Sequence, residues 1–240
     1  MLQTKSLTFD FHLRPNQIYD FRGAFIDMVA SSGKINDEGI SILSNRSYLN
    51  GVWGNVLDQY PLIQYRVEDG KASICTFGDG IVVIEKILHQ RITDQFTIRN
   101  QRLPLHIINT HKQERYISEN ANGETYMLFH YLPYDQYSDH DYHAAATMVD
   151  KIVVLQNTIN LAISNTLKAL GQSASSPKVT IIDIIHKDKA SYKTRDNEDR
   201  AVKMELTSYF LKIKCNLTNL DHLSIGKHKS VGYGVIRKVI

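Results

Sequence analysis

The sequence predicts an α+β protein made of two successive units, each built from strands and helices. Two observations lead to this prediction. Several short stretches alternate apolar and polar residues, which is the period of a half-buried strand, while others repeat apolar residues every three to four positions, as a helix does. These patterns follow one another in a similar order in both halves of the chain. Its 240 residues are enough for one large domain or two small ones.

The first half shows the order strand, helix, strand, strand, helix, strand. Residues 7–13 alternate as a strand, and a helical period runs from Ile18 to Val29. Asp69-Gly70, a strong hairpin signal, joins the next two predicted strands. These two strands are expected at 60–67 and 72–77. A helix is expected over 78–88, followed by strands at 96–98 and 105–108. This order is that of a ferredoxin-like (RRM-like) domain, expected over residues 1–110.

Residues 34–59 show no clear period and are rich in Asn, Ser and Gly, so we expect a long loop there. A loop of this length inside a compact domain is usually functional or mobile. It carries Arg46, Tyr48 and Trp53, side chains that suit contact with RNA. A plain flexible connection accounts for the composition equally well.

The second half repeats part of the same pattern. After a polar connection at 110–123, a strand is expected over 124–132, and a long amphipathic helix follows from Met148 to Leu170. A strand at 179–184 precedes a charged run at 186–200, which suits a solvated hairpin tip. The next strand, 211–217, turns Lys212 and Lys214 to its polar face. A second ferredoxin-like domain is thus expected over 122–240, with a glycine-rich loop where a second helix would stand.

The glycine-rich loop is the most distinctive stretch of the sequence. Gly226, Gly232 and Gly234 bracket the basic segment Lys227-His228-Lys229, and an apolar strand follows. Glycine lets the backbone take positive φ and approach a ligand closely. Successive exposed N–H groups favour anions, so phosphate is the expected ligand. A P-loop is excluded by the missing upstream glycine and helix, and a dinucleotide fingerprint fits poorly because a strand follows. A purely structural turn remains an alternative.

Composition excludes several classes of protein. The net charge of +3 is mild, so a nucleic-acid surface requires clustering of basic residues. Such clustering occurs at the C-terminus, where no acidic residue follows Asp221. Cys75 and Cys215 lack the spacing of metal ligands and fit reduced thiols. No apolar run approaches membrane-spanning length and no signal peptide is evident. We therefore expect a cytoplasmic protein with no membrane association.

Four segments, in order along nearly the whole chain, resemble the RAMP superfamily, and more narrowly its CRISPR-associated endoribonucleases that cut repeat RNA into guide RNAs. The last of the four fits the pattern G-h-G-x-x-x-x-x-G-h-G, where h is apolar, with Ser224 in place of the first glycine. The segments are Phe21-Arg22-Gly23-Ala24, Tyr60-Pro61-Leu62-Ile63-Gln64-Tyr65, Leu167-Lys168-Ala169-Leu170-Gly171 and Ser224–Gly234.

The resemblance implies metal-independent RNA cleavage without a cofactor. In that family the 2′-hydroxyl upstream of the scissile phosphate attacks it, leaving a 2′,3′-cyclic phosphate and a 5′-hydroxyl. Members often carry His-Asn-His before the second strand, where this chain has Leu43-Ser44-Asn45-Arg46. Asn45 is no general base, because an amide has no accessible pKa. The candidate catalytic residues are therefore Arg46, to stabilise charge, and Tyr48, to orient the 2′-hydroxyl or donate a proton.

A histidine from elsewhere in the chain is an alternative source of proton transfer. His228 lies in the glycine-rich loop, where contact with a phosphate is the stronger expectation. His12 suits a solvent-facing strand position, and His222 suits an ordinary loop. His140 and His143, beside Asp139 and Asp141, have a spacing that metal ligands can share, but a solvated helix start is much the stronger expectation. No metal site is predicted.

The predicted RNA-binding residues lie on the glycine-rich loop and on one strand: Lys212, Lys214, Gly226, Lys227, His228, Lys229, Gly232, Tyr233 and Gly234. The expected partner is CRISPR repeat RNA, with other CRISPR effector subunits as further candidates, and the family includes monomers and homodimers. Two alternatives stay open. One is a repeat-RNA-binding subunit that has lost cleavage, which the absent histidine favours. The other is an assembly module without a nucleic-acid role, which the acid-free C-terminus disfavours.

Overall fold

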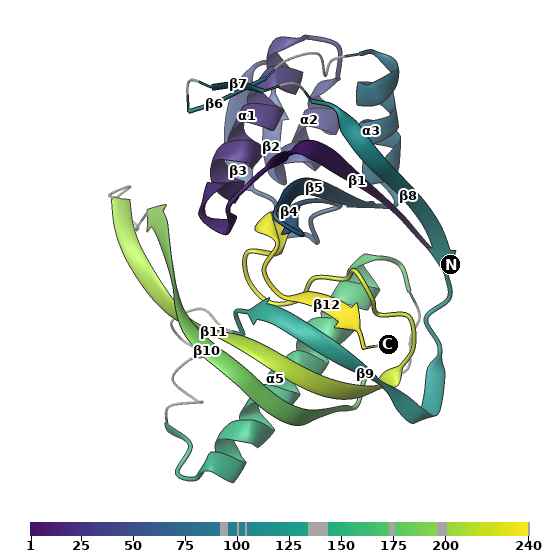
Figure 1. Ribbon diagram of the computed structural model, residues 1–240, viewed down its shortest axis with the longest axis vertical. Coiled ribbons are helices and arrows are strands. Elements are labelled where there is room, and N and C mark those ends of the chain that lie inside the picture. The colour runs from purple at the N-terminus through teal and green to yellow at the C-terminus, as the bar shows by residue number, and fades with distance from the viewer. Residues whose placement is uncertain are drawn as a thin grey trace. The chain divides into compact units, whose positions relative to one another are not determined.

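The computed structural model shows an α+β fold with two compact units (Figure 1). It describes residues 1–91, 96–99, 101–103, 105–133, 144–172, 176–195 and 201–239. Unit 1 comprises Met1–Arg115 with Ser230–Gly232, and unit 2 comprises Tyr116–Lys229 with Tyr233–Ile240. Each unit contains one four-stranded sheet whose neighbouring strands are antiparallel. No helix among the described residues is long and apolar enough to cross a membrane.

The sheet of unit 1 has the strand order β4-β5-β1-β8, which is the order of a ferredoxin-like sheet. Its strands are β1 (Leu2–His12), β4 (Ile63–Glu68), β5 (Lys71–Phe77) and β8 (Ile107–Arg115). The hairpin between β4 and β5 turns at Asp69 and Gly70, both with positive φ (51° and 73°), as the tight turn predicted from this dipeptide requires. The predicted order of the sheet strands is thus confirmed in this unit.

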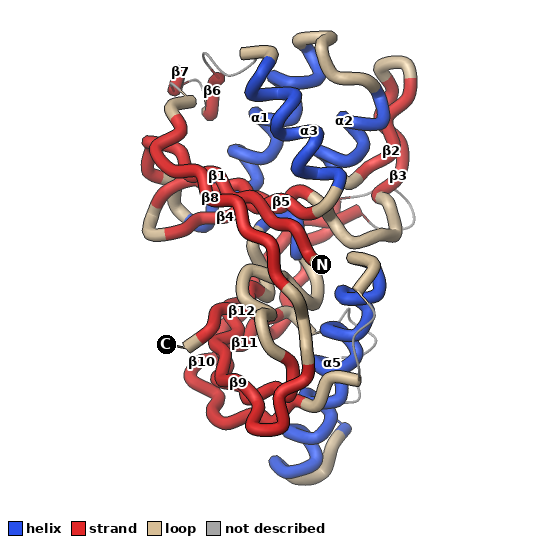
Figure 2. The backbone as a smooth tube through the Cα atoms, turned by 90° about the vertical axis from the view of Figure 1, so that its right-hand side faces the viewer, coloured by secondary structure: helices blue, strands red, loops and turns tan. Residues whose placement is uncertain are grey.

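Helices cover one face of this sheet, as the tube view shows (Figure 2). They are α1 (Ile18–Ser31), which follows a short 3-10 turn at Pro15–Gln17, α2 (Asp37–Ser44) and α3 (Asp79–His89). The core between α1 and the sheet is aromatic: Phe21 meets the rings of Phe9 and Tyr65 edge-on at 5.7 Å, and all three side chains are buried. Edge-to-face contacts of this kind add to the hydrophobic gain. They fix the side of α1 that faces the sheet.

The prediction of a loop at 34–59 is wrong. This segment forms α2 and a hairpin of β2 (Arg46–Leu49) and β3 (Val52–Val56). The Asn36 side chain caps α2 by accepting from the Gly39 amide at 3.2 Å. The helix ends at Asn45, whose φ of 52° turns the chain into β2. An eight-residue helix and a mostly exposed hairpin show too little apolar periodicity for a sequence pattern to reveal them.

The predicted connection at 110–123 is also wrong, since β8 runs to Arg115 and β9 begins at Glu119. Nearly all of the β8 side chains are exposed, so period-2 alternation is absent there. The predicted strand at 96–98 does form, as β6 (Phe96–Ile98), but it pairs with β7 (Gln101–Leu103) in a separate hairpin rather than joining the main sheet.

Unit 2 repeats the sheet order as β10-β11-β9-β12. Its elements are β9 (Glu119–Tyr131), α5 (Met148–Ala169), β10 (Val179–Arg195), β11 (Ala201–Leu217) and β12 (Val235–Lys238). A capping box starts α5: the Thr147 side chain accepts from the Asp150 amide, and the Asp150 carboxylate accepts from the Thr147 amide. Between β11 and β12 the glycine-rich loop carries only a 3-10 turn, Lys229–Val231. The predicted replacement of the second helix by this loop is confirmed.

Two polar side chains of α5 attach this helix to the edge strand β10. Asn160 Oδ1 accepts from the Val179 amide at 2.8 Å, and Gln156 Oε1 accepts from the Ile181 amide at 2.9 Å. The helix therefore satisfies backbone donors that an edge strand otherwise leaves to solvent. Beyond them β10 continues to Arg195, paired with β11. The charged run at 186–200 therefore lies within β10 as far as Arg195, in the part of the β10–β11 hairpin away from α5, and residues 196–200 lie outside the described residues.

Candidate functional site

The two predicted catalytic residues lie on β2 in unit 1. Arg46 is exposed, and its Nε and Nη2 donate to the Gly54 carbonyl across the hairpin at 3.2 and 3.0 Å. Tyr48 pairs with Trp53 in the β2–β3 register, and their ring centroids are 4.5 Å apart. The Tyr48 amide donates to Ser41 Oγ of α2 at 3.0 Å. The hairpin is thereby anchored to α2 and presents a guanidinium group beside two aromatic rings.

Arg46 and Trp53 line a cleft of about 190 Å³ together with residues of α1 and the end of α2. The most notable of these is Arg22, which the sequence indicates only as part of a motif. Its Nη2 donates to the Ser44 carbonyl, while its Nε is buried and has no hydrogen-bond partner among the described residues. The full lining is Arg22, Gly23, Ile26, Asp27, Ser44, Arg46 and Trp53.

The electrostatics of this cleft are those of two uncompensated cations. Burial lowers the pKa of Arg22, and the positive charge of Arg46 lowers it further, while Tyr65 opposes both. Neither guanidinium forms an ion pair with a carboxylate within the described part of the chain. A group that is both desolvated and repelled by a like charge gains from an anion. The cleft therefore favours a negatively charged ligand.

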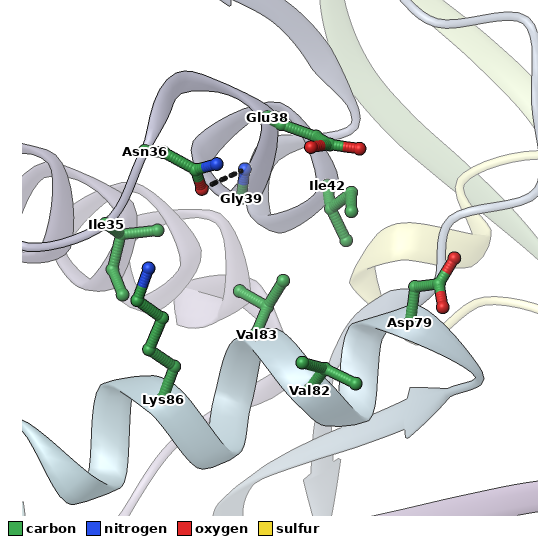
Figure 3. Close-up of a pocket in the computed structure, with 9 residues that line it drawn as sticks. All are labelled: Ile35, Asn36, Glu38, Gly39, Ile42, Asp79, Val82, Val83 and Lys86. Atoms are coloured by element: carbon green, nitrogen blue, oxygen red, sulfur yellow. Dashed lines mark hydrogen bonds between the residues drawn. The ribbon is translucent and has the colours of Figure 1, made fainter.

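A second cleft of unit 1, of about 280 Å³, lies between α2 and α3 (Figure 3). Its walls are largely aliphatic, with Ile42 and Val83 pointing into it, and the Glu38 and Asp79 carboxylates and the Lys86 ammonium add charge around them. None of the residues predicted to bind RNA lines this cleft. Its mixture of apolar surface and both signs of charge gives no indication of phosphate binding.

The glycine-rich loop in unit 2 folds back tightly on its neighbours. The Ile225 amide donates to the Gly234 carbonyl at 2.9 Å, and the Lys227 amide donates to the Leu132 carbonyl at 3.0 Å. A Cβ on Gly234 would lie 1.8 Å from the Ile225 carbonyl oxygen, and one on Gly226 would lie 2.5 Å from that of Leu132. Both glycines also have positive φ. They are required by close backbone packing, which holds the basic segment between them in place.

One part of the loop, Ser230–Gly232, belongs to unit 1, whereas the residues on either side belong to unit 2. There a Cβ on Gly232 would lie 3.2 Å from the Tyr65 carbonyl oxygen of β4. Two of the four segments that carried the resemblance, the strand segment ending at Tyr65 and the glycine-rich loop, therefore meet in the structure. Of the predicted loop residues, Gly226, Lys227, His228, Lys229, Tyr233 and Gly234 lie in unit 2.

His228 and Tyr233 form an aromatic cluster with a histidine that the sequence patterns do not single out. The Tyr233 ring lies 5.9 Å from the His228 ring and 6.4 Å from that of His130 on β9. His130 and His228 both have positive φ, 49° and 54°, a conformation uncommon for residues other than glycine. Burial, and then the charge of Lys227, lower the pKa of His228, and burial raises the pKa of Tyr233.

Lys212 and Lys214 point away from the core of the unit 2 sheet. Leu211, Ile213 and Cys215, which alternate with them, are buried. Lys212 pairs with Met127 of β9, and Met127 pairs with Arg237 of β12, so two basic side chains share one row across three strands. Phe129 and Phe210 stack at 4.7 Å and are both half-buried. The predicted basic face is thus confirmed as geometry, with Arg237 as an additional member.

Arg237 also belongs to a polar network that holds His222. The Arg237 guanidinium contacts both ring nitrogens of His222, and His222 Nε2 lies 2.9 Å from the Asp221 carboxylate. Burial raises the pKa of Asp221, but the hydrogen bond and charge of His222, with the Lys238 amide, bring it down to about 2. Because both ring nitrogens are engaged, His222 is suited to holding the loop rather than to proton transfer.

Three histidines considered from the sequence remain. His140 and His143 lie outside the described residues. Among the residues that the structure describes, no three His, Cys, Asp or Glu side chains are grouped to hold a metal ion. His12, the other histidine considered from the sequence, is exposed on β1 with Nδ1 3.3 Å from the Gly70 carbonyl.

Comparison with known proteins agrees with this architecture. Residues 52–116 match the family model of the Cas6b N-terminal domain, whereas a comparison with curated protein sequences gives no match. A crystal structure of Cas6b is similar with a TM-score of 0.75 at 17% identity, covering 99% of both chains. A CRISPR RNA processing endoribonuclease Cas6b gives 0.65 at 16% identity over 99% of both chains.

A third similar structure is Csf5, a type IV Cas6 crRNA endonuclease, with a TM-score of 0.60 at 11% identity over 100% of both chains. These TM-scores over nearly whole chains establish a common fold. The resemblance to repeat-RNA-processing endoribonucleases predicted from the sequence is therefore confirmed, as is the fold class of two tandem ferredoxin-like domains.

Proposed function

We propose that this protein is an endoribonuclease that binds CRISPR repeat RNA and cleaves precursor transcripts into guide RNAs in the cytoplasm. The observation that carries the proposal is the match of residues 52–116 to the Cas6b N-terminal domain, on a fold shared with Cas6b over 99% of the chain. The glycine-rich loop adds support, since it replaces a helix at the position where the resemblance places RNA contacts.

RNA binding is assigned to the glycine-rich loop and to the outer face of β11. Lys227, which is exposed, and Lys229 contact phosphates, and such contacts position RNA without specifying its sequence. Lys212 and Lys214 extend the same charge over the sheet. Tyr233 provides a ring on which an unstacked base can lie, the usual way in which single-stranded RNA is bound. Repeat RNA is the expected partner of a monomer or homodimer, alone or beside other CRISPR effector subunits.

The proposed chemistry is transesterification without a metal ion. The 2′-hydroxyl oxygen forms a bond to the adjacent phosphorus and gives up its proton, while the bond to the 5′-oxygen breaks and that oxygen takes up a proton. The products are a 2′,3′-cyclic phosphate and a 5′-hydroxyl. Arg46 stabilises the negative charge that develops on the phosphorane, and Tyr48 orients the 2′-hydroxyl.

A second candidate function is a repeat-RNA-binding subunit that does not cleave. It is favoured by the segment Leu43-Ser44-Asn45-Arg46, which has no proton-transfer group where the family often has two histidines. In the structure Asn45 forms the left-handed end of α2, so this position serves to turn the chain.

The test is incubation of the purified protein with labelled precursor RNA from its own array, in the presence of EDTA. We expect fragments one repeat and one spacer long, and a measurable Kd for the isolated repeat. Binding without fragments would instead identify the non-cleaving subunit. Neither binding nor cleavage, for a protein whose folding is verified by circular dichroism, would contradict both functions.

A further inference from the structure

The cleft lined by Arg22, Arg46 and Trp53 has chemistry for which the predicted catalytic role of Arg46 and Tyr48 does not account. Catalysis by charge stabilisation requires one guanidinium, but two converge on this cleft. Arg22 comes from α1 and Arg46 from β2, so the fold brings together residues that are 24 positions apart in sequence. An arginine pair placed in this way, without carboxylate partners in the described part of the chain, suits an anion with several acceptor oxygens.

The fixed orientation of the Arg22 side chain supports this conclusion. Its Nη2 is engaged by the Ser44 carbonyl, which fixes the orientation of the guanidinium. Its Nε, with no hydrogen-bond partner among the described residues, is a donor left unsatisfied at a cost comparable to a lost hydrogen bond. Nε is itself inaccessible to a ligand, but the Arg22 side chain lines the cleft, and arginine binds phosphate well because its planar fork matches two oxygens.

Trp53 supplies the second half of a nucleotide site. Its side chain remains 38% exposed although the Tyr48 ring lies 4.5 Å away, so part of the indole surface stays available. Bases stack on such rings with little dependence on sequence. The cleft volume of about 190 Å³ lies below that of typical drug-sized pockets, so the cleft takes at most one nucleotide, which stays partly exposed, and excludes a duplex.

We propose that this cleft is a subsite for a single nucleotide of the RNA, with Arg22 and Arg46 binding its phosphate and Trp53 stacking against its base. This inference rests on the proposed function, which supplies RNA as the ligand. Asp27 is exposed on the lining and its carboxylate repels a phosphate, so a bound nucleotide is expected to turn its base toward this side chain. There its carboxylate accepts from an amino group such as that of cytosine, so CMP is expected to bind more tightly than UMP.

The experiment uses an advantage of this chain, which contains a single tryptophan. Intrinsic tryptophan fluorescence therefore reports on Trp53 alone. The full-length protein is titrated with CMP, UMP, cytidine and inorganic phosphate. We expect saturable quenching by CMP, weaker quenching by UMP, and little by cytidine or phosphate at the same concentrations, because each of the latter two fills only half of the subsite.

Variants identify the groups responsible. Arg46→Gln and Arg22→Lys should each weaken CMP binding by roughly tenfold, the effect of losing one charge-assisted or bidentate contact. Arg102→Gln, an exposed arginine of the same unit, is the matched control and should leave the affinity unchanged. Asp27→Asn should reduce the difference in affinity between CMP and UMP. Arg46 is exposed, so Arg46→Gln retains the fold even where Arg22→Lys does not.

Two results would overturn the subsite. One is the absence of saturable quenching by any mononucleotide up to millimolar concentration. The other is a CMP affinity that falls no further in Arg46→Gln than in Arg102→Gln. These outcomes are independent of cleavage: a protein that binds CMP as described but never cuts RNA contradicts the proposed function alone, and one that cuts RNA without binding CMP contradicts the subsite alone.

Discussion

Individual residues of the glycine-rich loop have two separable roles, one in the backbone and one in ligand contact. Gly226 and Gly234 are needed because a Cβ would collide with carbonyl oxygens. Lys227 is exposed, and His228 and Tyr233 are half-buried beside it. The sequence was sufficient to predict the special backbone, since glycines so close together disfavour a regular helix or strand. It did not reveal His130 or Arg22, whose neighbours come from other elements and depend on tertiary packing.

Two glycine substitutions distinguish the cost of strained backbone from the cost of a steric collision. Gly171 and Gly234 have nearly the same φ, 67° and 66°, but a Cβ on Gly171 meets nothing within 4 Å. Gly171→Ala should therefore cost only about 1 kcal/mol of unfolding free energy, the strain of left-handed backbone. Gly234→Ala should cost more and abolish RNA binding, because the Ile225 carbonyl must move. If urea unfolding showed the same loss of unfolding free energy for both variants, Gly234 would not be packed as described.

His228 should make stability depend on pH. Burial and Lys227 lower its pKa below the ordinary 6.5, so the unfolded chain takes up this proton at a higher pH than the folded protein does. The stability contributed by neutral His228 is complete above pH 6.5 and is lost as the pH falls toward the folded-state pKa. His228→Gln should flatten this decline in urea unfolding between about pH 7.5 and 5.5, whereas His111→Gln, an exposed histidine of β8, should not. If the unfolding free energy of His228→Gln depended on pH in the same way as that of the unsubstituted protein, the burial of His228 would be contradicted.

Among the elements, those with clear apolar periodicity were predictable and those without it were not. The helix α5 runs from Met148 to Ala169, one residue short of the predicted end at Leu170. Most of the edge strand β8, beyond its predicted start at 105–108, was assigned as a connection, and the segment of α2, β2 and β3 was assigned as a loop, because their side chains are mostly exposed or the elements are too short to show a period. The catalytic candidates Arg46 and Tyr48 lie in this second group, so the sequence did not show that Arg22 and Trp53 lie beside them.

The attachment of α5 to β10 should be measurable. Replacing Gln156 and Asn160 by alanine leaves the amides of Ile181 and Val179 without acceptors, which should lower the unfolding free energy by about 2 kcal/mol in total. Asn157→Ala, on the exposed side of the same helix, should change it by less than about 0.5 kcal/mol. A double variant no less stable than the control would show that these amides find other acceptors.

The basic segment of the loop should act through phosphate contacts. The double substitution Lys227→Ala and Lys229→Ala should weaken repeat-RNA binding and reduce the slope of log K against log salt by about 0.7 for each lost contact with a single strand. Lys168→Ala with Lys178→Ala, two exposed lysines of unit 2, removes the same charge and should preserve the slope. An unchanged slope in the Lys227 and Lys229 variant would rule out this assignment.

At the scale of the whole molecule, the main sheets of the two units have the same strand order. The two units differ from a simple repeat before the last strand. Where unit 1 has α3 before its last strand, unit 2 has the glycine-rich loop. This exchange was visible in the sequence because a helical period is replaced by glycines and lysines. The loop also carries the positive charge of Lys227 and Lys229, which a packed helix would not present in the same way. RNA binding is therefore expected at the glycine-rich loop, where unit 2 differs from unit 1.

The central claim is RNA cleavage by the 2′-hydroxyl of the substrate itself. Once the cut site has been mapped, the most direct measurement compares repeat RNA with the same RNA carrying one 2′-deoxy residue immediately upstream of that site, both with EDTA. We expect the all-ribose RNA to be cut, leaving a 2′,3′-cyclic phosphate detectable by mass spectrometry, and the deoxy RNA to bind with the same Kd but remain intact. Cleavage of the deoxy RNA at the same position would contradict this claim, because the nucleophile would then be water.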